Sequence, residues 1–313
     1  MRVVVAATPA FALPTLDALA AAANVDITAV VTNPDRPRGR GLETGTPPVK
    51  EWARARHIPC FQPEKLTRDV VGQFPGLDFK CDAFVVVASA FYVPTWLRNL
   101  PALGAVNLHP SLLPALRGPA PIPYAVINGF QVTGVTTMLL ADEIDAGDIL
   151  LQEEVPVAAN DTGGSLAEKL AVKGAWLLVA TLDALGRGTL TPRPQDPDLA
   201  TYAPKITAET QVLDWMKSMV ILERLIRGLN PEPLAYTTLG KDRVQILRAR
   251  TARGIPGAAF GETLAVDAEG ILVACGDGAL VLQEVKPAGK GVMAADAFAR
   301  GRHVHKGTRW GSA

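Results

Sequence analysis

An amide, an imidazole and a carboxylate are spaced in this sequence so that they could act on one reacting atom. Asn107 and His109 are two positions apart at the end of a short apolar segment, and on a strand their side chains would point to the same side. Asp145 follows in a Gly-containing turn, where its carboxylate could polarise the imidazole or orient a water. The amide could donate to an oxygen that becomes negative in a tetrahedral transition state. Because no Ser or Cys nucleophile motif accompanies them, the three favour direct attack of an amine on a carbonyl carbon.

Other residues that could do chemistry are weaker candidates. A lone histidine near a strand end is more often structural than catalytic, so the functional interpretation of His109 depends on its spacing with Asn107 and Asp145. His303 and His305 have no third ligand near them in the sequence. The three cysteines are far apart, form no CxxC pair and are interpreted as buried small hydrophobes: Cys60, Cys81 and Cys275. We therefore expect no metal site.

Alternating strands and helices are expected to position the three polar residues. The segments 3–6, 27–31, 84–88 and 105–108 are apolar throughout, and 11–22 and 48–57 have helical spacing. Strands that are hydrophobic on both faces are typical of a parallel sheet covered by helices, so we expect an α/β fold. Two further strands, at 134–140 and 149–155, precede a helix at 165–185 whose expected capping box pairs Ser165 with Glu168.

A second, smaller domain is expected after a proline-rich stretch. Residues 191–198 contain three prolines and no hydrophobic anchor, which is typical of an extended linker. A helix at 215–228, with Trp215 in the core, precedes short strands at 243–247, 271–274 and 279–285, a pattern that suggests a small β-barrel. We predict a first domain at 1–190, a linker at 191–204 and a second domain at 205–313.

Composition limits the class of protein. Of 313 residues, 48% are apolar and 20% are charged, which predicts a globular chain. With no signal peptide and no apolar run long enough to cross a bilayer, we expect a cytoplasmic protein without membrane contact. The formal net charge is zero, but residues 201–313 hold 15 Lys and Arg against 11 Asp and Glu. This asymmetry weakly favours a polyanion near the C-terminal part, although ordinary scatter of surface charge explains it equally well.

Several motifs together resemble those of one family. The segment Asn107-Leu108-His109-Pro110-Ser111-Leu112-Leu113-Pro114 is followed by Arg117-Gly118 and then by Asp145-Ala146-Gly147. Thr8-Pro9, Asp35-Arg36-Pro37, the run Thr201-Tyr202-Ala203-Pro204-Lys205 and Asn230-Pro231 extend the likeness over nearly the whole chain. In these motifs the sequence resembles the folate-dependent formyltransferases.

The resemblance implies a Rossmann-like domain that binds 10-formyltetrahydrofolate as formyl donor, joined to an OB-like β-barrel that helps to hold tRNA. The implied acceptor is the amine of methionyl initiator tRNA, and no stable protein partner is implied. Asn107, His109 and Asp145 match the catalytic trio. Ser111, Leu112, Leu113 and Pro114 match the folate-contacting loop, and Ala88, Ser89, Ala90 and Phe91 match the segment that lines the pterin pocket. Arg40, with Arg38 beside it, matches the basic loop that enters the acceptor arm.

The sequence also departs from the family pattern and leaves alternatives open. Ala7 replaces a usual glycine, Ser89-Ala90 a usual Tyr-Gly pair, and Glu232 a common tryptophan. A sister formyltransferase acting on a nucleotide-sugar amine or on glycinamide ribonucleotide, a formyl-folate hydrolase and a non-catalytic RNA-binding module remain alternatives. An NAD-dependent dehydrogenase is disfavoured, because the segment after the first strand lacks G-x-G-x-x-G.

Overall fold

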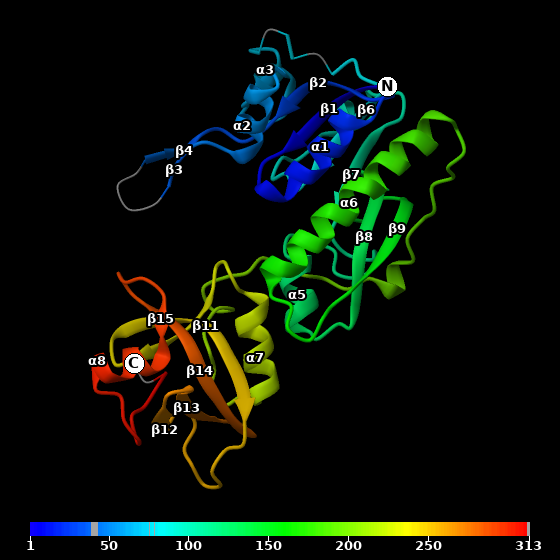
Figure 1. Ribbon diagram of the computed structural model, residues 1–313. Helices are drawn as coiled ribbons and strands as arrows, with labels where there is room; N and C mark the ends of the chain where they lie inside the picture. Colours follow the sequence, from blue (N-terminus) through cyan, green and yellow to red (C-terminus); the bar gives the residue numbers. More distant parts are fainter. Residues whose placement is uncertain (39–42, 75, 78, 312–313) are drawn as a thin grey trace. The chain divides into compact units, whose positions relative to one another are not determined.

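The computed structural model describes residues 1–38, 43–74, 76–77 and 79–311, which form two compact units. The first unit comprises residues 1–118, 132–156 and 167–203. The second comprises residues 119–131, 157–166 and 204–313. Each unit is built around its own sheet (Figure 1).

The first unit contains a seven-stranded sheet in the order β5-β2-β1-β6-β7-β8-β9. The strands from β5 to β7 pair in parallel, whereas β8 and β9 pair antiparallel at one edge. The strands are β1 (Arg2–Ala7), β2 (Asp26–Val31), β5 (Cys60–Phe61), β6 (Ala83–Val87), β7 (Ala105–His109), β8 (Val132–Leu139) and β9 (Ile149–Pro156). The predicted α/β class and mostly parallel sheet are confirmed.

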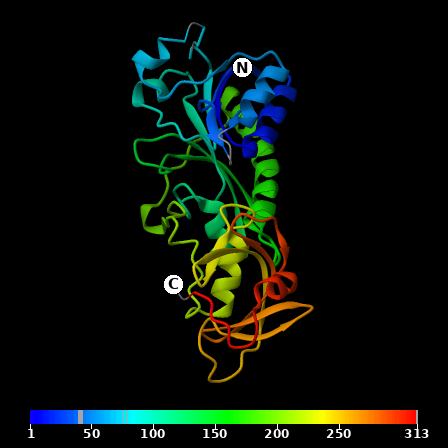
Figure 2. The same cartoon turned by 90° about the vertical axis from the view of Figure 1, so that its left-hand side faces the viewer.

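Helices lie against this sheet because its strands are apolar on both faces. Helix α1 packs against β2 and lies beside α2. The long helix α6 runs along the sheet (Figure 2). The helical and minor elements of the first unit are η1 (Ala10–Ala12), α1 (Leu13–Ala21), the hairpin of β3 (Arg36–Arg38) and β4 (Glu43–Gly45), α2 (Pro48–Ala55), α3 (Arg68–Val71), α4 (Thr95–Arg98), α6 (Gly163–Gly186) and η2 (Pro197–Leu199).

Helix α6 covers one face of strand β7, and a glycine in the helix makes this close contact possible. A Cβ placed on Gly174 would lie 2.7 Å from Leu108 Cδ2, so the absence of a side chain lets the helix approach the strand closely. Leu108 therefore points to α6. Because side chains alternate along a strand, Asn107 and His109 face the opposite side of the sheet, away from this helix.

The second unit is built on antiparallel strands in the order β10-β11-β14-β13-β12, with β15 paired to β14. An antiparallel sheet agrees with the short strands expected after the helix of the second domain, although that helix begins at Met219 and not at Trp215. The hydrophobic core includes Trp215, as predicted, and α7 packs against β11 while α8 packs against β14. The elements are α5 (Pro121–Ile127), α7 (Met219–Gly228), β10 (Ala235–Leu239), β11 (Asp242–Ala252), β12 (Thr263–Asp267), β13 (Gly270–Cys275), β14 (Gly278–Pro287), β15 (Met293–Ala294) and α8 (Ala295–Arg302).

The expected capping box of α6 is wrong. The helix begins at Gly163, two residues before the predicted start. Its first turn is closed by Thr162 and Ser165, in which each backbone N–H donates to the hydroxyl of the other residue, at 3.1 and 3.0 Å. Glu168 is exposed one turn further on and lies beyond the cap. Among the described helices, none is both long enough and apolar enough to span a membrane.

Candidate active site

Strand β7 presents Asn107 and His109 from its carboxyl end. Both are buried, with 9% and 4% of their surface exposed. Asn107 lies opposite Met138 of β8, and His109 lies opposite Thr136. The side-chain amide of Asn107 makes no hydrogen bond to any residue that the structure describes. It is therefore a nearly buried donor available for a bound molecule.

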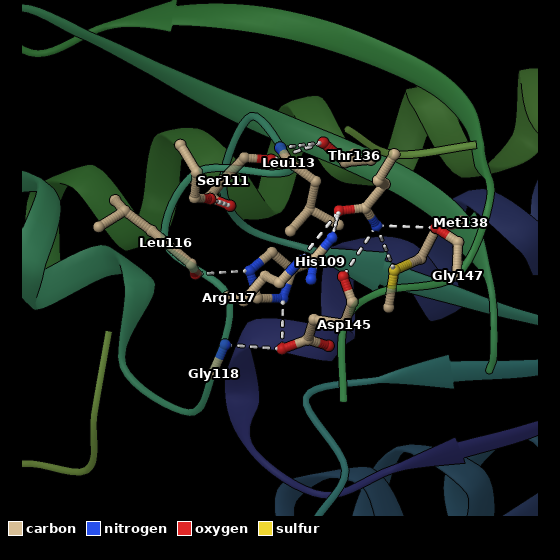
Figure 3. Close-up of polar contacts among 12 residues, drawn as sticks. His109, Ser111, Leu113, Leu116, Arg117, Gly118, Thr136, Met138, Asp145 and Gly147 are labelled. Atoms are coloured by element: carbon tan, nitrogen blue, oxygen red, sulfur yellow. Dashed lines mark hydrogen bonds and ion pairs between the residues drawn. The ribbon is translucent and has the colours of Figure 1, made fainter. Parts of the chain in front are cut away.

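The hydrogen bond made by His109 fixes its tautomer. Nε2 lies 3.1 Å from the carbonyl oxygen of Leu116, and because a carbonyl only accepts, Nε2 carries the hydrogen. The other ring nitrogen, Nδ1, lies 3.6 Å from Oδ2 of Asp145 (Figure 3). Burial lowers the pKa of the His109 imidazole, and the Asp145 carboxylate partly opposes that shift. The neutral ring is therefore favoured, with the lone pair of Nδ1 directed toward Asp145.

Asp145 reaches His109 from a turn that folds back over the sheet. Strand β8 ends opposite Val106, near the amino end of β7, yet Asp145 faces His109 at the carboxyl end. Asp145 has a left-handed φ of 54°, and its Oδ2 accepts a 2.8 Å hydrogen bond from the backbone N–H of Gly118. The structure thus brings together the imidazole and the carboxylate that are 36 positions apart in the sequence.

The loop after β7 is held by its own polar groups. The Ser111 hydroxyl donates to the carbonyl oxygen of Ala115 at 2.6 Å, and the Thr136 hydroxyl donates to the Ser111 carbonyl oxygen at 2.6 Å. Ser111 and Leu113 are buried, whereas Leu112 and Pro114 are half-buried. Of the four residues matched to the folate loop, Ser111 and Leu113 therefore shape it, and Leu112 and Pro114 keep surface available for contact.

The segment after β6 lies beside this loop, because β6 and β7 pair in parallel and Val87 lies opposite Leu108. Carboxyl ends of adjacent parallel strands are the usual place where open α/β sheets bind ligands. The side chains of Ala88 and Ala90 are exposed, and those of Ser89 and Phe91 are half-buried. The backbone turns sharply here, since Ala88 has a φ of 45° and Ser89 Oγ accepts from Phe91 N–H at 3.3 Å.

Comparison with known proteins now decides the family. Residues 1–182 match the formyl transferase family model, and residues 205–303 match that of the formyl transferase C-terminal domain. The chain is 42% identical to the methionyl-tRNA formyltransferase of Bacillus licheniformis, over 99% of this chain and 98% of that protein. It is also 42% identical to the one of Thiobacillus denitrificans, over the full length of both. This chain belongs to the formyl transferase family.

Solved structures share the fold of this formyl transferase at lower identity. HypX from Aquifex aeolicus in complex with tetrahydrofolic acid is 17% identical, with a TM-score of 0.62 over 96% of this chain and 47% of that one. The N-formyltransferase from Helicobacter canadensis, in complex with folinic acid and dTDP-3-aminofucose, is 17% identical, with a TM-score of 0.65 over 90% of this chain and 98% of that one. At this identity the likeness supports the fold alone.

The basic residues matched to RNA contact lie at the edge of the described structure. Arg38 ends β3, and its backbone lies opposite that of Glu43 in β4. Arg40 lies outside the described residues. The described part of the formyl transferase contains no group of three or more His, Cys, Asp or Glu side chains that could hold a metal ion.

Sequence reasoning missed two residues at the site, Gln195 and Thr201. Gln195 binds both the Asp145 turn and Arg117, and the Thr201 hydroxyl accepts from the backbone N–H of Leu116 at 2.9 Å. Both come from the chain segment that follows the first-unit strands and helices. Proline content identifies that segment as extended but carries no signal for polar contacts, so a glutamine among prolines does not stand out.

Proposed function

We propose that this protein transfers the formyl group of 10-formyltetrahydrofolate to the α-amine of methionyl initiator tRNA. The observation that carries the proposal is the 42% identity, over essentially the full length of both chains, to proteins named methionyl-tRNA formyltransferase. Matches to both the N-terminal and the C-terminal family models support it. A nucleotide-sugar amine is a less favoured acceptor, since the N-formyltransferase from Helicobacter canadensis, solved with dTDP-3-aminofucose, is only 17% identical.

In this proposal Asn107 stabilises the oxyanion. The acceptor amine attacks the formyl carbon, and the carbonyl oxygen becomes negative as the C–N bond forms. Asn107 is nearly buried, and its amide has no partner among the described residues, so it can donate to that oxygen without first breaking a bond within the protein. A donor that is preorganised in this way typically contributes about 3 to 4 kcal/mol to catalysis.

His109 and Asp145 manage the proton. As the amine attacks, its nitrogen gains positive charge and must lose a proton before the folate nitrogen leaves. Since Nε2 of His109 already donates to Leu116, Nδ1 is the nitrogen that can accept this proton. The resulting imidazolium lies against the Asp145 carboxylate, 3.6 Å away, which stabilises it and allows the proton to pass to the departing folate nitrogen.

The donor is proposed to bind at the carboxyl ends of β6 and β7. Ala88, Ala90, Leu112 and Pro114 have exposed or half-buried side chains there, and Phe91 adds a half-buried ring. The paired strands place the two segments next to each other. An apolar lining with a few polar groups is typical of ligand pockets, and a pterin is a planar ring whose faces can pack against apolar side chains while its polar edge binds hydrogen-bonding groups.

The acceptor tRNA is proposed to use the C-terminal part and the basic loop. We assign formyl transfer to a domain at 1–190, a linker role to 191–204 and tRNA binding to an OB-like domain at 205–313, with Arg38 and Arg40 as further tRNA-binding residues. The excess of positive charge in residues 201–313 supports this assignment. The cytoplasm, where charged initiator tRNA is made and used, is the proposed compartment.

The acceptor is tested by presenting purified protein with formyl-folate and one of three conditions: charged initiator tRNA, a nucleotide-sugar amine, or no acceptor. Release of the folate product is followed by absorbance, and the formylated product by mass spectrometry. We expect fast release only with the charged tRNA. Equal release without acceptor would identify a hydrolase, and release with the sugar alone would overturn the proposed acceptor.

A further inference from the structure

One glutamine, Gln195, is bound on both sides of its amide within the active site. Its Oε1 accepts hydrogen bonds from Nε and Nη2 of Arg117, at 3.0 and 2.8 Å. Its Nε2 donates to the carbonyl oxygens of Asp145 and Gly147, at 2.8 and 2.7 Å. A neutral amide has two donor hydrogens and two acceptor lone pairs, and all four are therefore used here.

These bonds hold the part of the turn that lies beyond the pairing of β8 with β9, which is closed by a hydrogen bond from Leu139 N–H to the Asp148 carbonyl oxygen. The turn must fold back over β7 to bring Asp145 to His109, and its first part is fixed by Arg98 of α4, which binds the Ala141 carbonyl oxygen and the Asp142 carboxylate. Gln195 fixes the later part, on both sides of Ala146. The Asp145 carboxylate reaches Nδ1 of His109 only while this later part stays in place.

The other half of the amide restrains Arg117. Arg117 is 4% exposed, and its Nη1 lies 3.6 Å from Oε1 of the exposed Glu143. A buried guanidinium needs acceptors for its donors, and Gln195 supplies one oxygen to two of them. Arg117 precedes Gly118, whose backbone N–H donates to the Asp145 carboxylate. Gln195 therefore binds the residue next to this donor as well as the backbone of Asp145 itself.

We propose that Gln195 is a positioning residue for the formyl transfer reaction: it holds Asp145 against His109 by binding the Asp145 turn and Arg117 at once. This inference rests on the proposed reaction centre, but it holds for any amine acceptor. Gln195 touches neither reacting group itself, and it acts through the carboxylate that it places.

The chemistry of the amide makes the proposal testable by two substitutions of similar size. Gln195→Leu removes the four hydrogen bonds above and the longer one from Nε2 to Sδ of Met138, at 4.0 Å. Gln195→Glu keeps an oxygen for Arg117 but directs a second oxygen, without hydrogens, at two carbonyl oxygens, and repels the turn. If positioning of the turn is what matters, both variants lower kcat by about 100-fold, since a shift of about 1 Å costs on that order, and KM for formyl-folate stays nearly unchanged.

Gln211→Leu and Gln211→Glu are the matched controls. Gln211 in the second unit also bridges an arginine and a carbonyl, accepting from Arg243 at 3.1 Å and donating to the Thr207 carbonyl oxygen at 3.0 Å, but it is only half-buried and both bonds are exposed to solvent. We expect kcat of both control variants to stay within about twofold of the parent protein, because loss of exposed hydrogen bonds has small effects.

A pH profile separates positioning from a loss of stability. Burial lowers the pKa of His109, and the Asp145 carboxylate, the charged group 3.6 Å from Nδ1, raises it together with the Leu116 carbonyl. If Asp145 moves away in Gln195→Leu, the acid limb of kcat/KM shifts to lower pH. A merely unfolded fraction would lower the whole profile without moving it.

The assays use the full chain at a temperature where circular dichroism shows each variant folded, with whichever amine the parent protein formylates. A reduced kcat in both Gln195 variants, with a displaced acid limb, supports the proposal. Parent kcat in Gln195→Leu would overturn it. Parent kcat in Gln195→Glu would also overturn it, since the contact with Arg117 alone would then be sufficient. An acid limb at its original pH would overturn it as well, since a loss of stability alone would then explain the reduced kcat.

Discussion

The side chain of Asn107 is exceptional among the polar groups of the site because it is nearly buried and unpaired within the described residues. His109, Ser111, Asp145 and Gln195 all have partners in the protein. The amide is not among the fully enclosed side-chain atoms without a partner in the described residues, so it keeps a small exposed surface at which a bound molecule could accept from it.

Asn107→Ala is expected to reduce turnover by about 100-fold or more, because an oxyanion donor contributes about 3 to 4 kcal/mol. Stability should change little, since no hydrogen bond to a described residue is lost. Single-turnover formyl transfer and thermal unfolding measure the two effects. The control is Asn99→Ala, an exposed position after α4. Parent turnover in Asn107→Ala would remove Asn107 from the mechanism.

At this scale the sequence predicted part of the site. The spacing of Asn107 and His109 on an apolar strand correctly predicted that they share a face, because alternation along a strand depends on local geometry alone. The tautomer of His109 could not be predicted, since it depends on a carbonyl oxygen of Leu116 placed by a left-handed residue. The catalytic roles remain predictions.

At the scale of the elements, the turn that carries Asp145 requires glycine at position 147. A Cβ placed on Gly147 would overlap the carbonyl oxygen of Leu139, which is also where the turn closes back onto β8. The backbone of Gly147 has no left-handed φ, so the requirement is for space alone. The Asp-x-Gly spacing therefore lets the turn pack closely against the end of β8 while it carries the carboxylate back over the sheet.

Gly147→Ala should consequently displace the turn, costing about 1 to 3 kcal/mol of stability and most of the turnover. Chemical unfolding and the transfer assay measure the two losses. Gly301→Ala is the control, because a Cβ at this exposed position of α8 meets nothing within 4 Å. It should be neutral or stabilising by up to about 1 kcal/mol. Equal behaviour of the two variants would contradict the packing argument.

Elements with strong periodicity were predicted well, and those fixed by distant contacts were not. Strands β1, β2, β6, β7, β8 and β9 agree with apolar runs in the sequence. The β3–β4 hairpin lies in a Gly- and Arg-rich stretch that has no strand pattern in the sequence. Such short elements lack a hydrophobic pattern, because they bury little apolar surface.

At the scale of the whole molecule, salt should affect the KM values of the two substrates differently. If residues 201–313 contact tRNA phosphates, raising salt from 50 to 200 mM should raise KM for tRNA by about tenfold for every two contacts. KM for formyl-folate should change much less, since the proposed folate segments carry no Lys or Arg. Steady-state kinetics at four salt concentrations checks this, with potassium chloride and potassium glutamate compared. A flat KM for tRNA would contradict phosphate binding by this part of the chain.

The two-part organisation was predicted from a proline-rich stretch and the short strands that follow it, and two family models match on either side of that stretch. The proposed boundaries remain predictions. The compact units draw segments 119–131 and 157–166 together with the C-terminal part. Ile127 of α5 packs against that core. A contact of this kind joins residues about a hundred positions apart, which no local pattern reveals.

The hydrogen bonds along residues 193–203 determine where extra chain length can be inserted. Arg193 exchanges two backbone hydrogen bonds with Ile149, and Gln195, Thr201 and Ala203 are each bonded to residues of the site loops. One added residue anywhere in this stretch would move every bonded group past its partner. Gly188 has open space around it. An affinity tag or fluorescent reporter therefore belongs at Gly188, upstream of these bonds, where added chain leaves them in register.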